Sequence, residues 1–119
     1  IKDFSHNMRQ AKLEDFFRGW FIGDFEPTML RTKDFEVGIL SHAKDEYWAP
    51  HYHKFAIEYN VLISGKMMIE LEDGTIKYLN PGDVFAFERG EISKPYFLED
   101  CKILVVKVPS VIGDKYESK

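Results

Sequence analysis

The sequence has little of what marks a secreted, membrane or nucleic-acid-binding protein. Its single cysteine, Cys101, excludes an intramolecular disulfide and is compatible with a reducing compartment. No stretch approaches the roughly 18 apolar residues of a membrane span, and no charged-then-apolar leader opens the chain, so we expect no secretory signal. The net charge is −4 and there is no basic run, so no nucleic-acid partner is indicated. We therefore expect a cytoplasmic protein.

Length and composition indicate one globular domain. The chain has 119 residues, of which 45% are hydrophobic and 30% are charged. A domain of this length can build a hydrophobic core without disulfides or structural metals. No linker, repeat or low-complexity tract divides it. We expect an N-terminal arm over residues 1–34 that packs on a barrel, the barrel itself over residues 35–109, and a loose C-terminal tail over residues 110–119.

Short extended runs separated by turn residues dominate the chain. We predict strands over residues 35–40, 51–53, 58–63, 66–71, 75–79, 84–87, 92–98 and 102–108. Asp73-Gly74 is typical of a hairpin turn, and Asn80-Pro81-Gly82-Asp83 of a tight turn. Many short strands at even spacing predict an all-β antiparallel sandwich or small barrel. Cys101 is interpreted as a small strand residue, because no motif surrounds its thiol.

One short helix is predicted, over residues 7–18 of the N-terminal arm. Asn7 can cap its start and Gly19 can end it. The apolar face of this helix would comprise Leu13, Phe16 and Phe17.

The segment His51-Tyr52-His53 carries the strongest functional signal. Side chains alternate along a strand, so two histidines two residues apart point to the same face and can converge on one cation. Glu58 adds a carboxylate, and two imidazoles with one carboxylate suit a first-row divalent metal that keeps open coordination positions. The offset from His53 to Glu58 is odd, so in one regular strand they would face opposite sides. If both act at one site, the backbone must bend, bulge or change strand between Lys54 and Ile57.

These residues resemble the first sequence motif of the cupin superfamily. That motif is a glycine, His-x-His, a glutamate after three or four residues, and a glycine after six more. His51, His53, Glu58 and Gly65 fit it, whereas Gly38 lies upstream at a longer spacing than the motif prefers. The resemblance implies a double-stranded β-helix, or jelly-roll barrel, which is often dimeric.

The second cupin motif is matched only in part. It would begin at Gly82, with Glu88 in place of its proline, Ser93 in place of its histidine and Phe97 in place of its asparagine. In metal-binding cupins that histidine is usually the fourth protein ligand, and a neutral hydroxyl such as that of Ser93 is a weak donor. The departure implies a three-residue metal site, a low metal affinity, or a site that works without metal.

Further residues are candidates for the pocket. Ser93 is expected to line it, because its motif position points inward, and Phe97 would share that face, although core packing is the preferred interpretation of Phe97. Tyr47, Trp48 and Tyr52 flank the two histidines. These aromatic residues could form a stacking wall for a sugar ring or base, with ordinary packing as the alternative.

Three functions remain open from the sequence. The leading hypothesis is a small metal-binding enzyme, an isomerase, epimerase or oxygenase, that acts on a polar, carbohydrate-like substrate. It would hold a divalent ion (Zn, Fe, Mn or Ni) on His51, His53 and Glu58. The second is a metal-free isomerase or epimerase of a nucleotide-linked sugar, in which His51 and His53 serve as acid and base. The third is a non-catalytic module that binds a small ligand. We also expect a homodimer, because sheet edges and apolar faces need cover.

Overall fold

All eight strands expected from the sequence are present in the computed structural model, which describes residues 8–118. They are β3 (Glu36–His42), β4 (His51–Tyr52), β5 (Ile57–Ser64), β6 (Met67–Leu71), β7 (Ile76–Leu79), β8 (Val84–Phe87), β9 (Ser93–Phe97) and β10 (Cys101–Val108). Three more were not predicted as strands: β1 (Trp20–Gly23), β2 (Leu30–Arg31) and β11 (Tyr116–Glu117).

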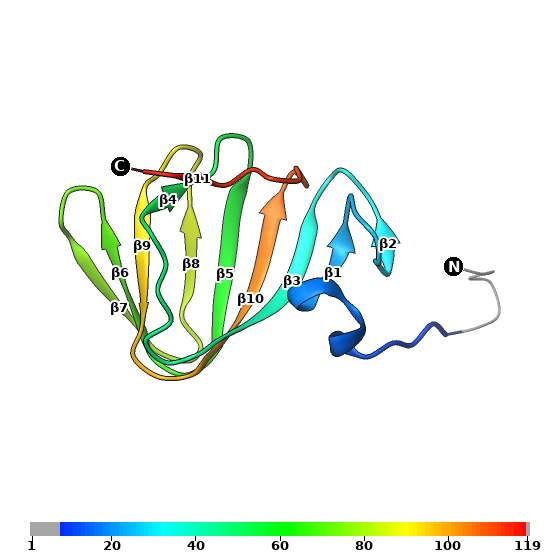
Figure 1. Cartoon of the computed structure of the whole chain (residues 1–119), viewed down its shortest axis with the longest axis horizontal. Coiled ribbons are helices and arrows are strands. Elements are labelled where there is room, and N and C mark those ends of the chain that lie inside the picture. The colour runs from blue at the N-terminus through cyan, green and yellow to red at the C-terminus, as the bar shows by residue number, and fades with distance from the viewer. Residues whose placement is uncertain (1–7, 119) are drawn as a thin grey trace.

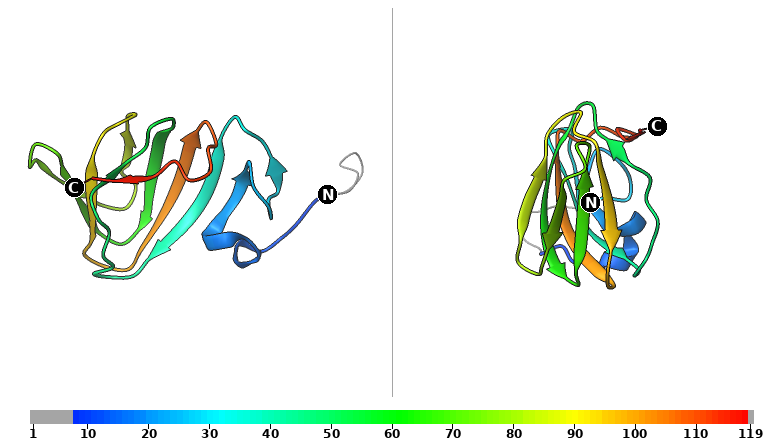
Figure 2. Two further views of the ribbon diagram at one scale, coloured as in Figure 1. Left: turned by 45° about the horizontal axis from the view of Figure 1, so that its top comes forward. Right: turned by 90° about the vertical axis from the view of Figure 1, so that its left-hand side faces the viewer.

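The strands form two sheets, as Figures 1 and 2 show. One sheet has six strands in the order β2-β1-β3-β10-β5-β8, and the other has five in the order β11-β4-β9-β6-β7. Every pairing is antiparallel except that of β1 with β2. This confirms the predicted all-β double-stranded β-helix, a barrel made of two sheets.

The core lies between the two sheets. Strand β5 sends Leu62, which is fully buried, into it, and β10 sends Ile103 and Val105. The other members of the buried cluster are Met67, Ile69, Phe97 and Cys101. Cys101 is 2% exposed, as a small strand residue would be, and burial raises the pKa of its thiol. The thiol is therefore unreactive at neutral pH.

The predicted N-terminal helix is wrong. Residues 8–118 contain no α-helix and only two 3₁₀ turns, η1 (Leu13–Asp15) and η2 (Phe17–Gly19), and Asn7 lies outside the described residues. Arg18 takes a left-handed backbone conformation (φ 53°), and Gly19 follows with φ 86°, which no helix can accommodate. None of these turns is long or apolar enough to cross a membrane.

Segments near both ends of residues 8–118 are built into the sheets (Figure 1). In the N-terminal arm, β1 pairs with β3 and extends the six-stranded sheet. At the other end, β11 pairs with β4, and the backbone N–H of Ser118 donates to the carbonyl of Pro50. This differs from the loose tail expected over residues 110–119. Because the segment after β10 crosses to the opposite sheet, it can reach a site that lies between the sheets.

The homodimer stays a prediction. The outer face of the six-stranded sheet carries exposed apolar side chains on β5 and β8. Val61 and Val84 are opposite each other across β5 and β8, so Tyr59, Ile63 and Val84 share one face, and their exposed fractions are 46%, 45% and 74%. This face, together with Phe17 (70% exposed) in the N-terminal arm, is the surface that a second copy would cover.

The glycine that closes the first sequence motif has a steric role. Gly65 ends the β5–β6 turn with φ 85°, and a Cβ built there would lie 2.2 Å from the carbonyl oxygen of Asp100. Gly74, in the next hairpin, has nearly the same φ (87°) but nothing within 4 Å of such a Cβ. The two positions therefore share a backbone conformation and differ only in the space around it.

We expect Gly65→Ala to destabilise the fold far more than Gly74→Ala. Both variants place alanine in the left-handed region, at a cost of about 1–2 kcal/mol. Only Gly65→Ala adds a clash with the backbone, so its loss should exceed that of Gly74→Ala by at least about 1 kcal/mol. Urea unfolding followed by tryptophan fluorescence measures both losses. Equal losses would contradict the steric role of Gly65.

Candidate functional site

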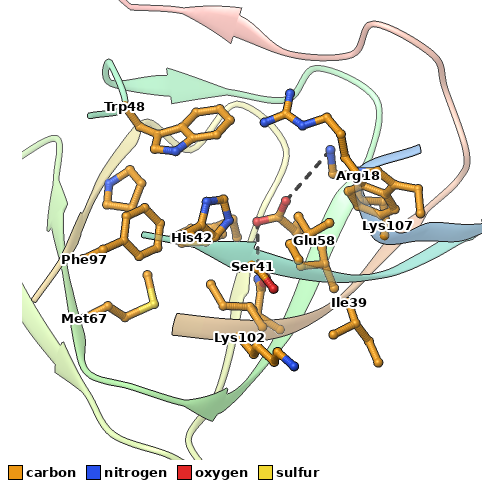
Figure 3. Close-up of a pocket in the computed structure, with 18 of the residues that line it drawn as sticks. Arg18, Ile39, Ser41, His42, Trp48, Glu58, Met67, Phe97, Lys102 and Lys107 are labelled. Atoms are coloured by element: carbon orange, nitrogen blue, oxygen red, sulfur yellow. Dashed lines mark hydrogen bonds and ion pairs between the residues drawn. The ribbon is translucent and has the colours of Figure 1, made fainter. Parts of the chain in front are cut away.

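A cavity of about 850 Å³ is lined by residues of both sheets, of the N-terminal arm and of the C-terminal segment. His51, His53, Glu58 and Ser93 all line it. As Figure 3 shows, one end of the cavity is apolar, with Met67 and Phe97, and the other is charged. A cavity of this size and mixed character suits a small organic ligand.

The two histidines of the site are each held by a backbone carbonyl. Nδ1 of His51 lies 3.0 Å from the carbonyl oxygen of Ala49, and Nδ1 of His53 contacts the carbonyl oxygen of Asp114. A carbonyl can only accept, so in the neutral form each Nδ1 carries the proton and each Nε2 keeps its lone pair. Nε2 of His53 is buried and has no hydrogen-bond partner among the described residues.

His53 and Glu58 meet because the chain changes sheet between them. Strand β4 belongs to the five-stranded sheet and β5 to the six-stranded sheet. The turn over residues 54–56 thus resolves the odd offset, and Nε2 of His53 lies 3.6 Å from a carboxylate oxygen of Glu58. This change of strand was one of the three possibilities that the sequence left open.

Asp114 holds this turn from the C-terminal segment. Its carboxylate, on a residue 5% exposed, accepts hydrogen bonds from the backbone N–H groups of Lys54, Phe55 and Ala56 at 2.9–3.3 Å. Burial acts to raise the pKa of Asp114, but these donors outweigh it and hold the pKa below its usual range. The same residue therefore fixes the turn with its side chain and the ring of His53 with its carbonyl.

Glu58 has two further neighbours. Nζ of Lys107 lies 4.0 Å from the same carboxylate oxygen that faces His53, and the side-chain amide of Asn60 donates to the other oxygen at 3.3 Å. Across the site, burial lowers the pKa of His51, and the charge of Lys115 adds to the effect. His51 is therefore a neutral imidazole at neutral pH, able to accept a proton or bind a cation.

The donor chemistry fits a divalent metal only in part. An imidazole held at Nδ1 by a carbonyl is the usual arrangement of a histidine that ligates through Nε2. However, no group of three or more His, Cys, Asp or Glu side chains within residues 8–118 is arranged to hold a metal ion. Ser93, 6% exposed and paired in register with His51, supplies no fourth imidazole.

The predicted pocket residues separate into two groups. Ser93, Phe97 and Trp48 line the cavity, and Phe97 is also a core residue, as preferred from the sequence. Tyr47 and Tyr52 are not among the lining residues. Tyr47 is 73% exposed, and Tyr52, between the two histidines, faces the opposite side of β4 and stacks on Tyr116. Of the three aromatic residues suggested as a stacking wall, Trp48 alone lines this cavity.

Sequence reasoning missed the residues that position Trp48 and Phe97 at the cavity. One carboxylate oxygen of Glu46 accepts hydrogen bonds from Trp48 Nε1 and His42 Nδ1, both at 2.6 Å. The ring of His42 stacks on Phe97 with centroids 4.4 Å apart. His42, interpreted from the sequence as a loop residue, is thus the last residue of β3 and lines the cavity.

Cationic residues of the cavity were also missed as site residues: besides Lys102, which is exposed, there are three. Arg18 comes from η2, Lys107 from β10 and Lys115 from the C-terminal segment. Alternation along β10 could have placed Lys107, because it shares parity with the buried Ile103 and Val105. No sequence signal placed the other two, since both depend on how the ends of the chain pack.

Solved structures similar to this chain share its fold. An uncharacterized conserved protein with a double-stranded beta-helix domain from Klebsiella pneumoniae matches with a TM-score of 0.70 and 17% identity, covering 95% of this chain and 99% of that one. KdgF from Halomonas sp. matches with a TM-score of 0.62 and 23% identity (67% and 74% covered). A cupin-2 domain containing protein from Shewanella frigidimarina matches with a TM-score of 0.57 and 20% identity (66% and 74% covered). No protein-family model and no curated protein sequence matches the chain.

We expect Asp114→Asn to lower the free energy of unfolding at pH 7 by roughly 2 kcal/mol, because hydrogen bonds to a charged acceptor contribute about 1.5–3 kcal/mol each. The pKa of Asp114 is lower in the folded state than in the unfolded state. Its contribution is therefore full above the unfolded value, near 3.9, and is lost as pH falls through the folded value. Urea unfolding between pH 7 and 3 should show less acid loss in the variant.

Asp100→Asn is the matched control for this prediction. Asp100 is exposed and accepts one backbone hydrogen bond, from Lys44 at 2.8 Å. Its replacement should cost less than about 1 kcal/mol. An Asp114→Asn loss no larger than that of Asp100→Asn would contradict the proposed role of the turn.

Proposed function

We propose that this chain, which has the double-stranded β-helix fold of the cupin superfamily, is a small isomerase or epimerase that moves a proton on a polar, carbohydrate-like carbonyl compound. The site itself is the basis, because the fold hosts many chemistries. One observation carries the proposal: Nε2 of His53 is buried without a hydrogen-bond partner in the described part of the chain, next to Glu58 and within one cavity with His51.

The two imidazoles have different surroundings, and this supports different roles. The pKa of His51 is lowered by burial, so its neutral Nε2 suits a general base that removes a proton from the carbon next to the carbonyl. His53 faces Glu58 at 3.6 Å, so a proton on its Nε2 has a carboxylate to pair with. His53 then gives that proton to the carbonyl oxygen. The protonated His51 returns its proton to a carbon of the enediol that forms, and an enediol hydroxyl gives its proton back to Nε2 of His53, which yields the isomer and restores both imidazoles.

The surroundings of the pair keep these roles apart. The ring centroids of His51 and His53 are 5.7 Å apart, close enough for both rings to reach one carbonyl compound in the cavity that they line. Both Nδ1 atoms are held by carbonyl groups, so only Nε2 of each ring is free to exchange a proton. Trp48, fixed by Glu46, closes one wall beside His51 and helps to exclude water.

A metal-dependent version of this enzyme is the second candidate, because both histidines have the Nδ1 support typical of metal ligands. His51, His53 and Glu58 would hold the ion. A bound divalent ion would act as a Lewis acid on a carbonyl or hydroxyl oxygen. Glu58 would have to turn from Lys107 for this, since an ammonium lies 4.0 Å from its carboxylate.

We expect the protein to exchange the proton next to a carbonyl with solvent. The experiment incubates it in D₂O with a panel of ketoses, uronates and nucleotide-linked keto-sugars, and follows loss of the carbon-bound proton by NMR. His53→Gln should lower the exchange rate by about 10²–10⁴-fold, the usual contribution of an acid–base group. Tyr47→Phe, outside the cavity, is the control and should leave the rate unchanged.

The same assay separates the candidates. Exchange that survives treatment with a chelator, with no metal found by elemental analysis, supports the metal-free reaction. Exchange that stops with the chelator and returns on adding zinc, manganese, nickel or iron would replace it with the metal-dependent one. No exchange with any compound, under all loading conditions, would overturn the enzyme proposal in favour of a binding module.

A further inference from the structure

Three cationic side chains from distant parts of the sequence meet at the charged end of the cavity. Arg18, Lys107 and Lys115 all line it. Figure 3 shows Arg18 and Lys107 on the side of Glu58, away from the apolar end formed by Met67 and Phe97. The N-terminal turn, the last long strand and the C-terminal segment thus each contribute one positive charge to the same region.

Aromatic rings hold these cations in place. Nζ of Lys115 lies 3.3 Å from the centroid of the Trp48 ring, and the guanidinium carbon of Arg18 lies 6.0 Å from the same centroid. Nζ of Lys107 lies 5.1 Å from the centroid of the Trp20 ring. A cation over an aromatic face is attracted to it but not neutralised, so its hydrogen-bond donors stay available.

Nearby carboxylates do not balance these charges. Among the ion pairs of residues 8–118, Lys107 pairs with Glu58, and neither Arg18 nor Lys115 takes part in any. Glu14 also lines the cavity, and Glu58 and Glu117 attract Lys115 without forming an ion pair with it. The pKa of Lys115 is lowered to about 8, first by burial and then by the charges of Lys107 and Arg18. Mutual repulsion of these three cationic side chains therefore opposes their placement in one region.

The backbone conformation of Arg18 is also energetically unfavourable. Its φ of 53° is left-handed, which is unfavourable for a residue with a side chain, by about 1–2 kcal/mol. The following Gly19 packs so closely on β3 that a Cβ would lie 2.1 Å from the carbonyl oxygen of Ile39. This turn fixes the position from which the guanidinium reaches the cavity, and strain of this kind is typical of functional sites.

We propose that Arg18, Lys107 and Lys115 form a subsite for an oxyanion group of the substrate, so that the substrate class is an acidic sugar derivative. The group is a carboxylate or a phosphate ester, both of which suit one guanidinium and two ammonium donors. The proposal rests on the proposed function only for the reaction that follows, since binding of the anion needs no turnover. The cavity, at about 850 Å³, holds a hexose together with such a group.

Calorimetric titration with three probes tests the subsite. Glucuronate carries a carboxylate, glucose 6-phosphate carries a phosphate, and glucose carries neither. At pH 7 and constant ionic strength, at least one acidic probe should bind 10-fold or more tightly than glucose. Whichever acidic probe binds more tightly identifies the anion. Equal binding of all three, or no binding by either acidic probe, would overturn the proposal.

Charge-removing variants locate the anion. Lys115→Gln and Arg18→Gln should each weaken binding of the acidic probe by 10-fold or more, whereas Lys115→Arg should restore most of it. Lys77→Gln removes the same charge from exposed strand β7, outside the cavity, and should change nothing. Equal weakening by Lys77→Gln would show a general charge effect and overturn the subsite. Thermal unfolding of each variant checks that the fold is intact.

The subsite and the reaction can fail separately. His53→Gln should keep the affinity for the acidic probe while proton exchange falls. Probe binding that depends on Lys115, without exchange of any compound, supports the subsite and removes the isomerase. Exchange of an acidic sugar that is unaffected by Lys115→Gln and Arg18→Gln supports the isomerase and removes the subsite.

Discussion

The contact between Asp114 and the turn over residues 54–56 is the constraint on which the site depends. At this turn the chain leaves one sheet and enters the other, so three consecutive backbone N–H groups have no strand partner. The carboxylate of Asp114 accepts hydrogen bonds from all three N–H groups. Its carbonyl oxygen at the same time sets the tautomer of His53. The C-terminal segment is therefore part of the cavity.

The same segment places Lys115 one residue later, over Trp48. Trp48 is held from its other edge by Glu46, which also holds His42, and His42 stacks on Phe97. A single chain of contacts thus runs from the C-terminal segment to the apolar end of the cavity. A substitution at one of these residues should displace the side chains of the others, because each ring is positioned by its neighbour.

The sequence was sufficient for eight of the eleven strands of residues 8–118 and for the histidine pair, because these depend on local alternation and turn residues. The eight predicted strands are present, and the odd offset between His53 and Glu58 correctly required a break in the strand. The same alternation should have removed Tyr52 from the pocket, since it lies between two inward histidines. Arg18, Asp114 and Lys115 could not be found in this way, because their places depend on long-range packing of the two ends of the chain.

The charges around Glu58 connect the two open questions about this site. Lys107 and His53 approach the same carboxylate oxygen, at 4.0 Å and 3.6 Å. A divalent cation on His51, His53 and Glu58 would therefore stand beside an ammonium group and would be repelled by it. An anion bound by Lys107, Lys115 and Arg18 would offset that repulsion. Substrate and metal would then favour each other's binding, and by linkage each would raise the affinity for the other by the same factor.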